Sequence, residues 1–277
     1  MITKIICPVD FMPASLNAAT YAAAFSRMLN TRLHLVHIQQ FLPVSSPMSM
    51  GVEIYPYMEE VKKGMEQKLK ALADELGKAH QIPVNYSVED TTGTMEAALA
   101  KEDLSHALIT MGTNGADDMY QRFFGSDTYH AIKEVDCALL MVPEKVVYSP
   151  VKKVLFAWDY SKESEFSFSS LNDLLQKFDP DYEFVHVSKT DTEIGEDVFR
   201  ALKGEITDAL QAKNKVKFKH VYSGDIPATL HEAMLQSDAG LFCMTYHKRG
   251  IIANFFHGEV ARKISEMASY PVLVLHT

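Results

Sequence analysis

One pattern of alternating strands and helices occurs twice in this chain, and that repeat limits the folds open to it. The first copy spans residues 1–143 and the second follows in the same order. An aspartate follows the first apolar run of each copy, at Asp10 and Asp159, 149 positions apart. Met111 and Met244 also occupy equivalent places in the two copies. They are 133 positions apart, fewer than the two aspartates, because the second copy has a shorter middle loop. A repeat this long predicts two similar domains rather than a solenoid.

Apolar β-branched runs and amphipathic spacing predict the elements. Strands are expected at residues 2–9, 32–38, 83–89, 107–111, 138–142, 153–158, 182–187, 216–222, 240–245 and 271–275. Helices are expected at residues 16–29, 57–79, 94–102, 126–134, 163–178, 196–212, 227–236 and 258–268. Ser15 is the expected N-cap of the first helix, and a polar loop is expected over residues 39–55.

This alternation, with nearly continuous apolar strands, predicts an α/β fold with helices on both faces of a parallel sheet. Right-handed crossovers then give two tandem, doubly wound, five-stranded domains with ligands at the carboxyl edge. The expected domains are residues 1–143 and 151–277, joined by the polar linker 143–150. The last strands, ALLMV at 138–142 and PVLVL at 271–275, are too apolar to remain open edges. We expect them to pair with each other in an intramolecular pseudo-dimer, or with a second chain in a homodimer.

Composition narrows the functional class. The 277 residues are 47% hydrophobic with a net charge of -9, which argues against a nucleic-acid partner. No apolar run approaches the roughly 18 residues of a membrane span, so no membrane partner is expected. Cys7, Cys137 and Cys243 form no CxxC pair and are expected to be buried, reduced thiols. Such sparse cysteine usage is typical of a cytoplasmic protein.

A glycine-rich stretch, MGTNGADDMYQRFFGS, follows the expected strand at 107–111. Its motif is G-x2-G-x9-G-S, formed by Gly112, Gly115, Gly125 and Ser126. Glycines can adopt positive φ and approach an anion closely. A helix N-terminus after Gly125 and Ser126 would direct N–H groups and its dipole toward a phosphate. Alternatively, the first two glycines only form a turn and Ser126 is only an N-cap.

These features resemble the universal stress protein family, over the whole chain as two tandem units. The resemblance implies a Rossmann-like, adenine nucleotide alpha-hydrolase-like fold that binds ATP, or ADP or AMP, with or without Mg²⁺. The implied binding residues are Pro8 and Asp10 at the first strand, His37 or Ile38 near the adenine, Met111 beside the base, and Gly112, Gly115, Gly125, Ser126 and Thr128 near the phosphates. From the residues alone, Asp10 could equally form a helix cap or turn.

Asp127 departs from the family pattern, in which the residue after Gly-Ser is usually small or apolar. Its carboxylate would repel a triphosphate unless Mg²⁺ or Arg122 lies between them. Asp127 therefore belongs to the candidate site as the residue that most affects which nucleotide binds.

The second copy lacks the motif. With Met244 aligned to Met111, the motif positions hold Thr245, Lys248, Gly258 and Glu259. A carboxylate at that helix start would take the place of the phosphate, so no nucleotide is expected there. The alternatives are an anion site formed by Lys248, Arg249 and His257, and a metal site formed by His231, His247 and His257. The lack of zinc-type spacing disfavours the metal site.

The sequence favours a binding protein over an enzyme. It contains no G-x4-G-K-[ST], G-x-S-x-G or H-E-x-x-H motif. We expect a stress-response regulatory or adaptor protein that acts through protein partners of unknown identity, with weak ATP hydrolysis at most. One alternative is a slow ATPase or phosphoryl-transfer enzyme. Another is a carrier of small molecules or lipids, for which the Met-rich stretch 47–57 is the only support.

Overall fold

The computed structural model describes residues 2–40, 54–91, 98–99, 102–113, 137–158, 164–189, 196–210, 215–246 and 270–276. The strands are β1 (Lys4–Pro8), β2 (Arg32–Gln40), β3 (Val84–Thr91), β4 (Ala107–Thr113), β5 (Ala138–Pro143), β6 (Lys153–Ala157), β7 (Asp181–Ser188), β8 (Val216–Tyr222), β9 (Leu241–Tyr246) and β10 (Val272–His276). The helices are α1 (Pro13–Leu29), α2 (Ile54–His80), α5 (Ser164–Leu175), α6 (Glu196–Leu210) and α7 (Ile226–Ser237). All ten expected strands and these five expected helices are confirmed. The helices expected at 94–102, 126–134 and 258–268 lie wholly or largely outside the described residues.

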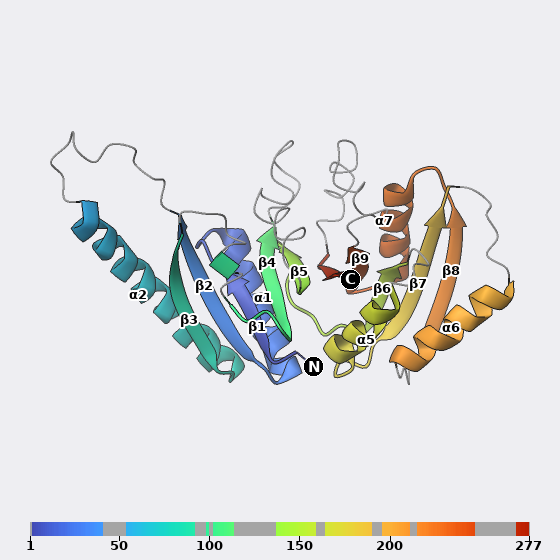
Figure 1. Ribbon diagram of the computed structural model, residues 1–277, viewed down its shortest axis with the longest axis horizontal. Coiled ribbons are helices and arrows are strands. Elements are labelled where there is room, and N and C mark those ends of the chain that lie inside the picture. Colours follow the sequence, from blue (N-terminus) through green and yellow to red (C-terminus); the bar gives the residue numbers. More distant parts are fainter. Residues whose placement is uncertain are drawn as a thin grey trace.

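The ten strands form one continuous sheet with the order β3-β2-β1-β4-β5-β10-β9-β6-β7-β8. Within each half, all neighbouring strands are parallel. The predicted doubly wound, five-stranded parallel arrangement is therefore present in both halves. In Figure 1, the arrowheads of β4, β7 and β8 all point toward the upper side of the view.

The two halves join through their last strands. β5 and β10 pair antiparallel, with Leu140 opposite Leu273 at the centre and Val272 opposite Met141 and Val274 opposite Leu139 on either side. Leu139 and Met141 are equivalent to Val272 and Val274 in the repeat, and each pairs with the equivalent of the other. This is the pattern across the two-fold axis of an isologous dimer. The structure selects pairing within the chain, which was the first of the two alternatives for these apolar strands.

Two apolar clusters cover the two faces of the sheet. One contains buried side chains from α1, α2, α5 and α6, and the other contains Leu99 and buried side chains from α7. Two aromatic contacts on the first face link α1 to the second half and to the connecting segment, respectively. The rings of Phe25 and Phe178 lie 4.8 Å apart, and those of Tyr21 and Tyr148 lie 5.1 Å apart. Asn17 of α1 also donates to the carbonyls of Pro143 and Val146 in the connecting segment, at 2.9 Å each.

Two local expectations are wrong. Ser15 is not the N-cap, because α1 begins at Pro13 with Met12 as the cap residue. Proline favours the first turn of a helix, where its missing N–H needs no partner. The loop expected at 39–55 is also shorter at both ends, since β2 extends to Gln40 and α2 begins at Ile54. The other residues of that loop lie outside the described part of the chain.

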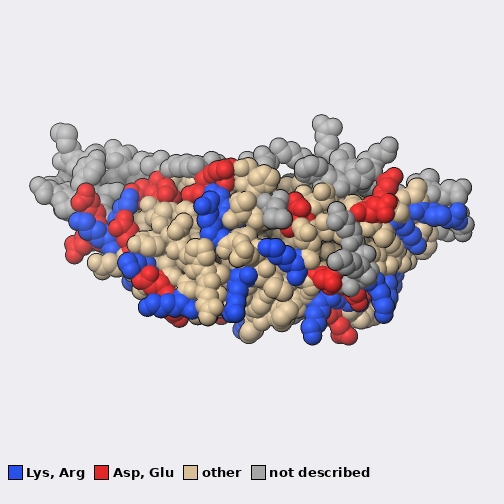
Figure 2. Space-filling view, turned by 90° about the horizontal axis from the view of Figure 1, so that it is seen from below, with Lys and Arg blue, Asp and Glu red and all other residues tan. Residues whose placement is uncertain are grey.

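Charged side chains of both signs are scattered over the face of the molecule seen in Figure 2, between larger areas of other residues. Lysines and arginines alternate there with aspartates and glutamates, with no extended region of one sign. Some opposite charges on the surface form close pairs, such as Lys70 with Asp74 along α2 at 2.6 Å.

Candidate functional site

The strand order places a topological switch point between β1 and β4. The chain leaves β1 toward α1 on one face, and it enters β4 from the segment that carries Leu99 on the other face. Ligands of doubly wound sheets bind in the crevice at the carboxyl end of such strands. The register of β1 with β2 and β4 aligns these ends, with Pro8 beside Val36 and Ile6 beside Ile109.

Six predicted site residues are described, and all lie at this edge. Pro8 and Asp10 are at the end of β1, His37 and Ile38 are near the end of β2, and Met111 and Gly112 are near the end of β4. The other predicted residues, Gly115, Gly125, Ser126, Asp127 and Thr128, lie outside the described residues.

Three of these residues have side chains that divide between the two faces of the sheet. Met111 is 6% exposed and belongs to the cluster opposite α1, and Ile38 packs against that same cluster. His37 instead contacts Phe11, which packs against the cluster on the α1 side. Met111, Ile38 and His37 therefore share one edge of the sheet, while the first two side chains pack on one face and the third on the other.

Asp10 organises the turn between β1 and α1. Its Oδ1 accepts from the Met12 N–H at 2.9 Å and from the Ser15 hydroxyl at 2.5 Å. The Ser15 Oγ in turn accepts from the Asp10 N–H at 3.3 Å. Asp10 thus forms the turn that the residues alone allowed, and its exposed side chain remains at the sheet edge. Ser15 lies within the first turn of α1 and stabilises the turn through these two hydrogen bonds.

His37 ties the end of β2 to the end of β1. Its Nδ1 lies 2.7 Å from the Val9 carbonyl, and the Val9 N–H donates to the Val36 carbonyl at 2.8 Å. The His37 ring also lies 5.4 Å from the ring of Phe11. Phe11 has a φ of 65°, a left-handed conformation that is costly for a bulky side chain. The packing of Phe11 against His37 and the α1-side cluster offsets that cost.

Gly112 is required by packing between α1 and β4. A Cβ at this position would lie 2.3 Å from the Ala14 carbonyl oxygen and 2.7 Å from the Ser15 nitrogen. Gly112 lies within β4 and its φ is outside the left-handed range, so the need for glycine here comes from close packing and not from a positive φ. The close approach predicted for this glycine exists, but its partner is the backbone of the first turn of α1.

The second half preserves part of this arrangement. The sheet register confirms the alignment of Met244 with Met111, which places the buried Thr245 where Gly112 stands. His186 Nδ1 lies 2.7 Å from the Trp158 carbonyl, as His37 does from Val9. Asp159, His247, Lys248, Arg249, His257, Gly258 and Glu259 lie outside the described residues. His231 contacts the Tyr270 hydroxyl at 3.1 Å, and no metal-binding group of three or more His, Cys, Asp or Glu occurs within the described ranges.

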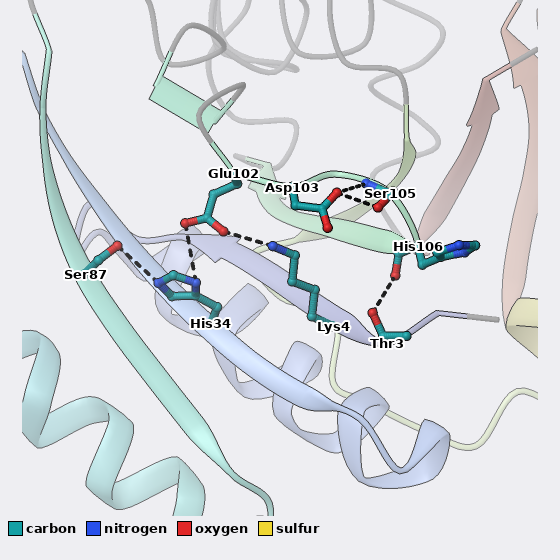
Figure 3. Close-up of polar contacts among 8 residues, drawn as sticks. All are labelled: Thr3, Lys4, His34, Ser87, Glu102, Asp103, Ser105 and His106. Carbon is teal, nitrogen blue, oxygen red and sulfur yellow. Dashed lines mark hydrogen bonds and ion pairs between the residues drawn. The ribbon is translucent and has the colours of Figure 1, made fainter.

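The sequence did not predict a partly buried polar cluster on the face opposite α1 (Figure 3). Lys4, only 8% exposed, donates to Glu102 at 2.9 Å, and Glu102 lies 3.7 Å from His34 Nδ1. The other ring nitrogen of His34 contacts Ser87 at 3.1 Å. A signal was available, because Lys153 is 149 positions after Lys4, the same interval as between the two aspartates. Lys153 is likewise paired, with Glu183 at 2.7 Å and the Ser237 carbonyl at 2.6 Å.

His34 should make the protein less stable in mild acid. Burial lowers its pKa, outweighing the opposing effect of Glu102, while Lys4 lowers it further. Because the unfolded chain binds this proton more readily than the folded one, stability is complete above the ordinary histidine value near 6.5 and decreases as pH falls toward the lower, folded value. Urea unfolding from pH 7.5 to 5 should show a shallower loss of stability for His34→Gln than for the wild type. Identical slopes would contradict this expectation.

The three cysteines are buried and none of them forms a disulfide, as predicted. Burial raises the pKa of Cys7 and of Cys243 well above the ordinary value. Because the thiolate is the reactive form, these two side chains act as small apolar core residues rather than nucleophiles.

A sequence model of the universal stress protein family matches residues 1–143. The chain belongs to the universal stress protein family. The matched residues contain the first five strands and every predicted binding residue. A search of curated proteins gave no match.

Solved structures agree with this fold over both halves. A universal stress protein from Archaeoglobus fulgidus DSM 4304 is similar with a TM-score of 0.73 and 18% identity, covering 99% of this chain and 98% of that one. A functionally unknown protein from Pseudomonas aeruginosa PAO1 gives 0.54 and 13%, covering 99% and 92%. The cytoplasmic domain of a prokaryotic cation chloride cotransporter gives 0.55 and 11%, covering 99% and 95%. Among the helices that the structure describes, none has the length and apolarity needed to cross a membrane.

Proposed function

We propose that this universal stress protein binds an adenine nucleotide at the carboxyl edge of β1, β2 and β4. The observation that carries the proposal is the meeting, at the switch point, of the Asp10 turn, the end of β2 and the start of the glycine-rich stretch at Gly112. Family membership supports it, because the glycine motif and the preceding aspartate resemble the ATP-binding branch. The proposed domains are residues 1–143, which hold the nucleotide, and 151–277, which do not.

The proposed role is regulatory. A nucleotide held at this edge would set the conformation of the surrounding surface. A protein partner would then bind that surface differently in the nucleotide-bound and nucleotide-free states. We propose this adaptor role in the cytoplasm rather than catalysis, because the polar side chains described at the edge are used in hydrogen bonds that hold the turn and the strand ends. The Ser15 hydroxyl is engaged by Asp10, and His37 is engaged by the Val9 carbonyl.

Binding can be tested directly on the purified chain. The supernatant of denatured protein is analysed by mass spectrometry, and nucleotide-free protein is titrated calorimetrically with ATP, ADP and AMP, with and without Mg²⁺. Gly115→Val should weaken binding by about tenfold or more, which corresponds to about 1.4 kcal/mol. Gly204→Val is the matched control, because Gly204 lies on α6 with open space around its Cβ position. Protein that carries no nucleotide and binds none at millimolar concentration would overturn the proposal.

Asp127 should set the preference among nucleotides. Its carboxylate adds a negative charge beside the phosphates, and the repulsion grows with the charge of the ligand. We expect Asp127→Asn to increase affinity for ATP by several-fold in the absence of Mg²⁺ and to change affinity for AMP much less. Equal changes for ATP and AMP would place Asp127 away from the terminal phosphates. Phosphate release measured in the same samples tests the slow ATPase alternative.

A further inference from the structure

The same imidazole-to-backbone contact occurs once in each half of the molecule. His37 Nδ1 and the Val9 carbonyl lie 2.7 Å apart, and so do His186 Nδ1 and the Trp158 carbonyl. Each histidine is 28 residues after its partner. Because a carbonyl oxygen can only accept, Nδ1 must carry the hydrogen in both cases. The contact has therefore persisted in both copies of the repeat, including the copy whose motif is lost.

In the first half, this contact holds the residue that precedes Asp10. The Val9 N–H donates to the Val36 carbonyl at 2.8 Å, and the Val9 carbonyl accepts from His37, so β2 holds Val9 on both sides. The next residue is Asp10, whose carboxylate fixes Met12 and Ser15. His37 is therefore linked to the start of α1 in two steps. It holds Val9, and the next residue, Asp10, holds Met12 and Ser15.

The ring of His37 is also held on its side. It lies 5.4 Å from the Phe11 ring at an interplanar angle of 45°, and Lys68 of α2 lies 6.0 Å from the Phe11 ring centre. The hydrogen bond from Nδ1 to Val9 and the packing against Phe11 both restrict the ring. Such a ring is suited to hold the turn in place rather than to move with a ligand.

We infer that His37 is a positioning residue of the nucleotide site, which acts through Val9 on Asp10 and not by contact with the nucleotide. This inference rests on the proposed function, and it names the ring nitrogen that matters. If His37 positions the turn, the hydrogen on Nδ1 is essential. If His37 touched the nucleotide from the outer end of its ring, Nε2 would be essential.

Asparagine and glutamine separate these two roles. The side-chain nitrogen of asparagine is two bonds from Cβ, like Nδ1 of histidine, whereas that of glutamine reaches about as far as Nε2. His37→Asn should keep nucleotide affinity within about threefold of the wild type, because Nδ2–H can donate to Val9. His37→Gln should lose about tenfold or more. His186→Gln removes the equivalent contact in the second half, and it should lower the urea midpoint as His37→Gln does while leaving affinity unchanged.

The reverse order of affinity, with His37→Gln retained and His37→Asn weakened, would overturn the inference in favour of direct contact. Full affinity in both variants would overturn it as well, since the contact would then not matter for binding. If His37→Gln does not fold, the asparagine variant decides, because weak binding by folded His37→Asn also overturns the inference. Wild-type protein that binds no nucleotide would instead refute the proposed function, and the inference with it.

Discussion

Gly112→Ala is expected to lower the free energy of unfolding by about 3 kcal/mol, near the upper end for overpacking a well-packed site. The added methyl group would lie 2.3 Å from the Ala14 carbonyl oxygen and 2.4 Å from the Ala14 carbonyl carbon. Both are backbone atoms in the first turn of α1, so no side-chain rotation can relieve the clash. α1 must move away from β4, and urea unfolding followed by circular dichroism measures the cost.

Gly204→Ala is the matched control for this prediction. Gly204 lies within α6 and has no atom within 4 Å of its Cβ position, so alanine there should stabilise the protein by about 0.5–1 kcal/mol. An unchanged midpoint for Gly112→Ala would show that α1 does not lie against β4 as closely as the structure indicates. Nucleotide affinity should also fall in Gly112→Ala, because the displaced turn of α1 carries Ser15, which holds Asp10.

The sequence could predict the sheet because each strand signal is local. Runs such as ALIT at 107–110 and VLF at 154–156 are buried on both faces, as expected for a parallel sheet covered on both sides. The partner of the apolar last strands was not predictable in the same way. Leu140 can face an equivalent leucine in its own chain or in a second copy, and the composition of the strand is the same in both cases.

The site was predictable in position but not in the roles of its residues. Switch-point logic brings the ends of β1, β2 and β4 together once the strand order is known. It does not reveal that Ser15 hydrogen-bonds to Asp10, because that contact depends on α1 starting at Pro13, three residues earlier than expected. It also does not show that the space beside Gly112 is filled by α1, since sequence spacing carries no information on how closely a helix approaches a strand.

Leu140→Ala at the junction of the two halves is expected to destabilise both halves together. Leu140 and Leu273 face each other across β5 and β10, and they are 0% and 1% exposed. Truncating a fully buried leucine costs about 2–5 kcal/mol. If the ten strands unfold as one unit, this change in the first half must lower the stability of the second half by the same amount.

Trp158 makes this measurable, because it is the one tryptophan of the sequence and lies in the second half, buried among Phe168, Phe184 and Phe218. Its fluorescence reports the second half, whereas circular dichroism reports both. In urea, Leu140→Ala should shift the two transitions equally, and Leu273→Ala should give a matching shift. Leu235→Ala on α7, where the side chain is 59% exposed, should leave both transitions in place. If the Trp158 transition stays at its wild-type midpoint in Leu140→Ala while the circular dichroism signal splits into two steps, the halves unfold independently and the β5–β10 pairing does not couple them.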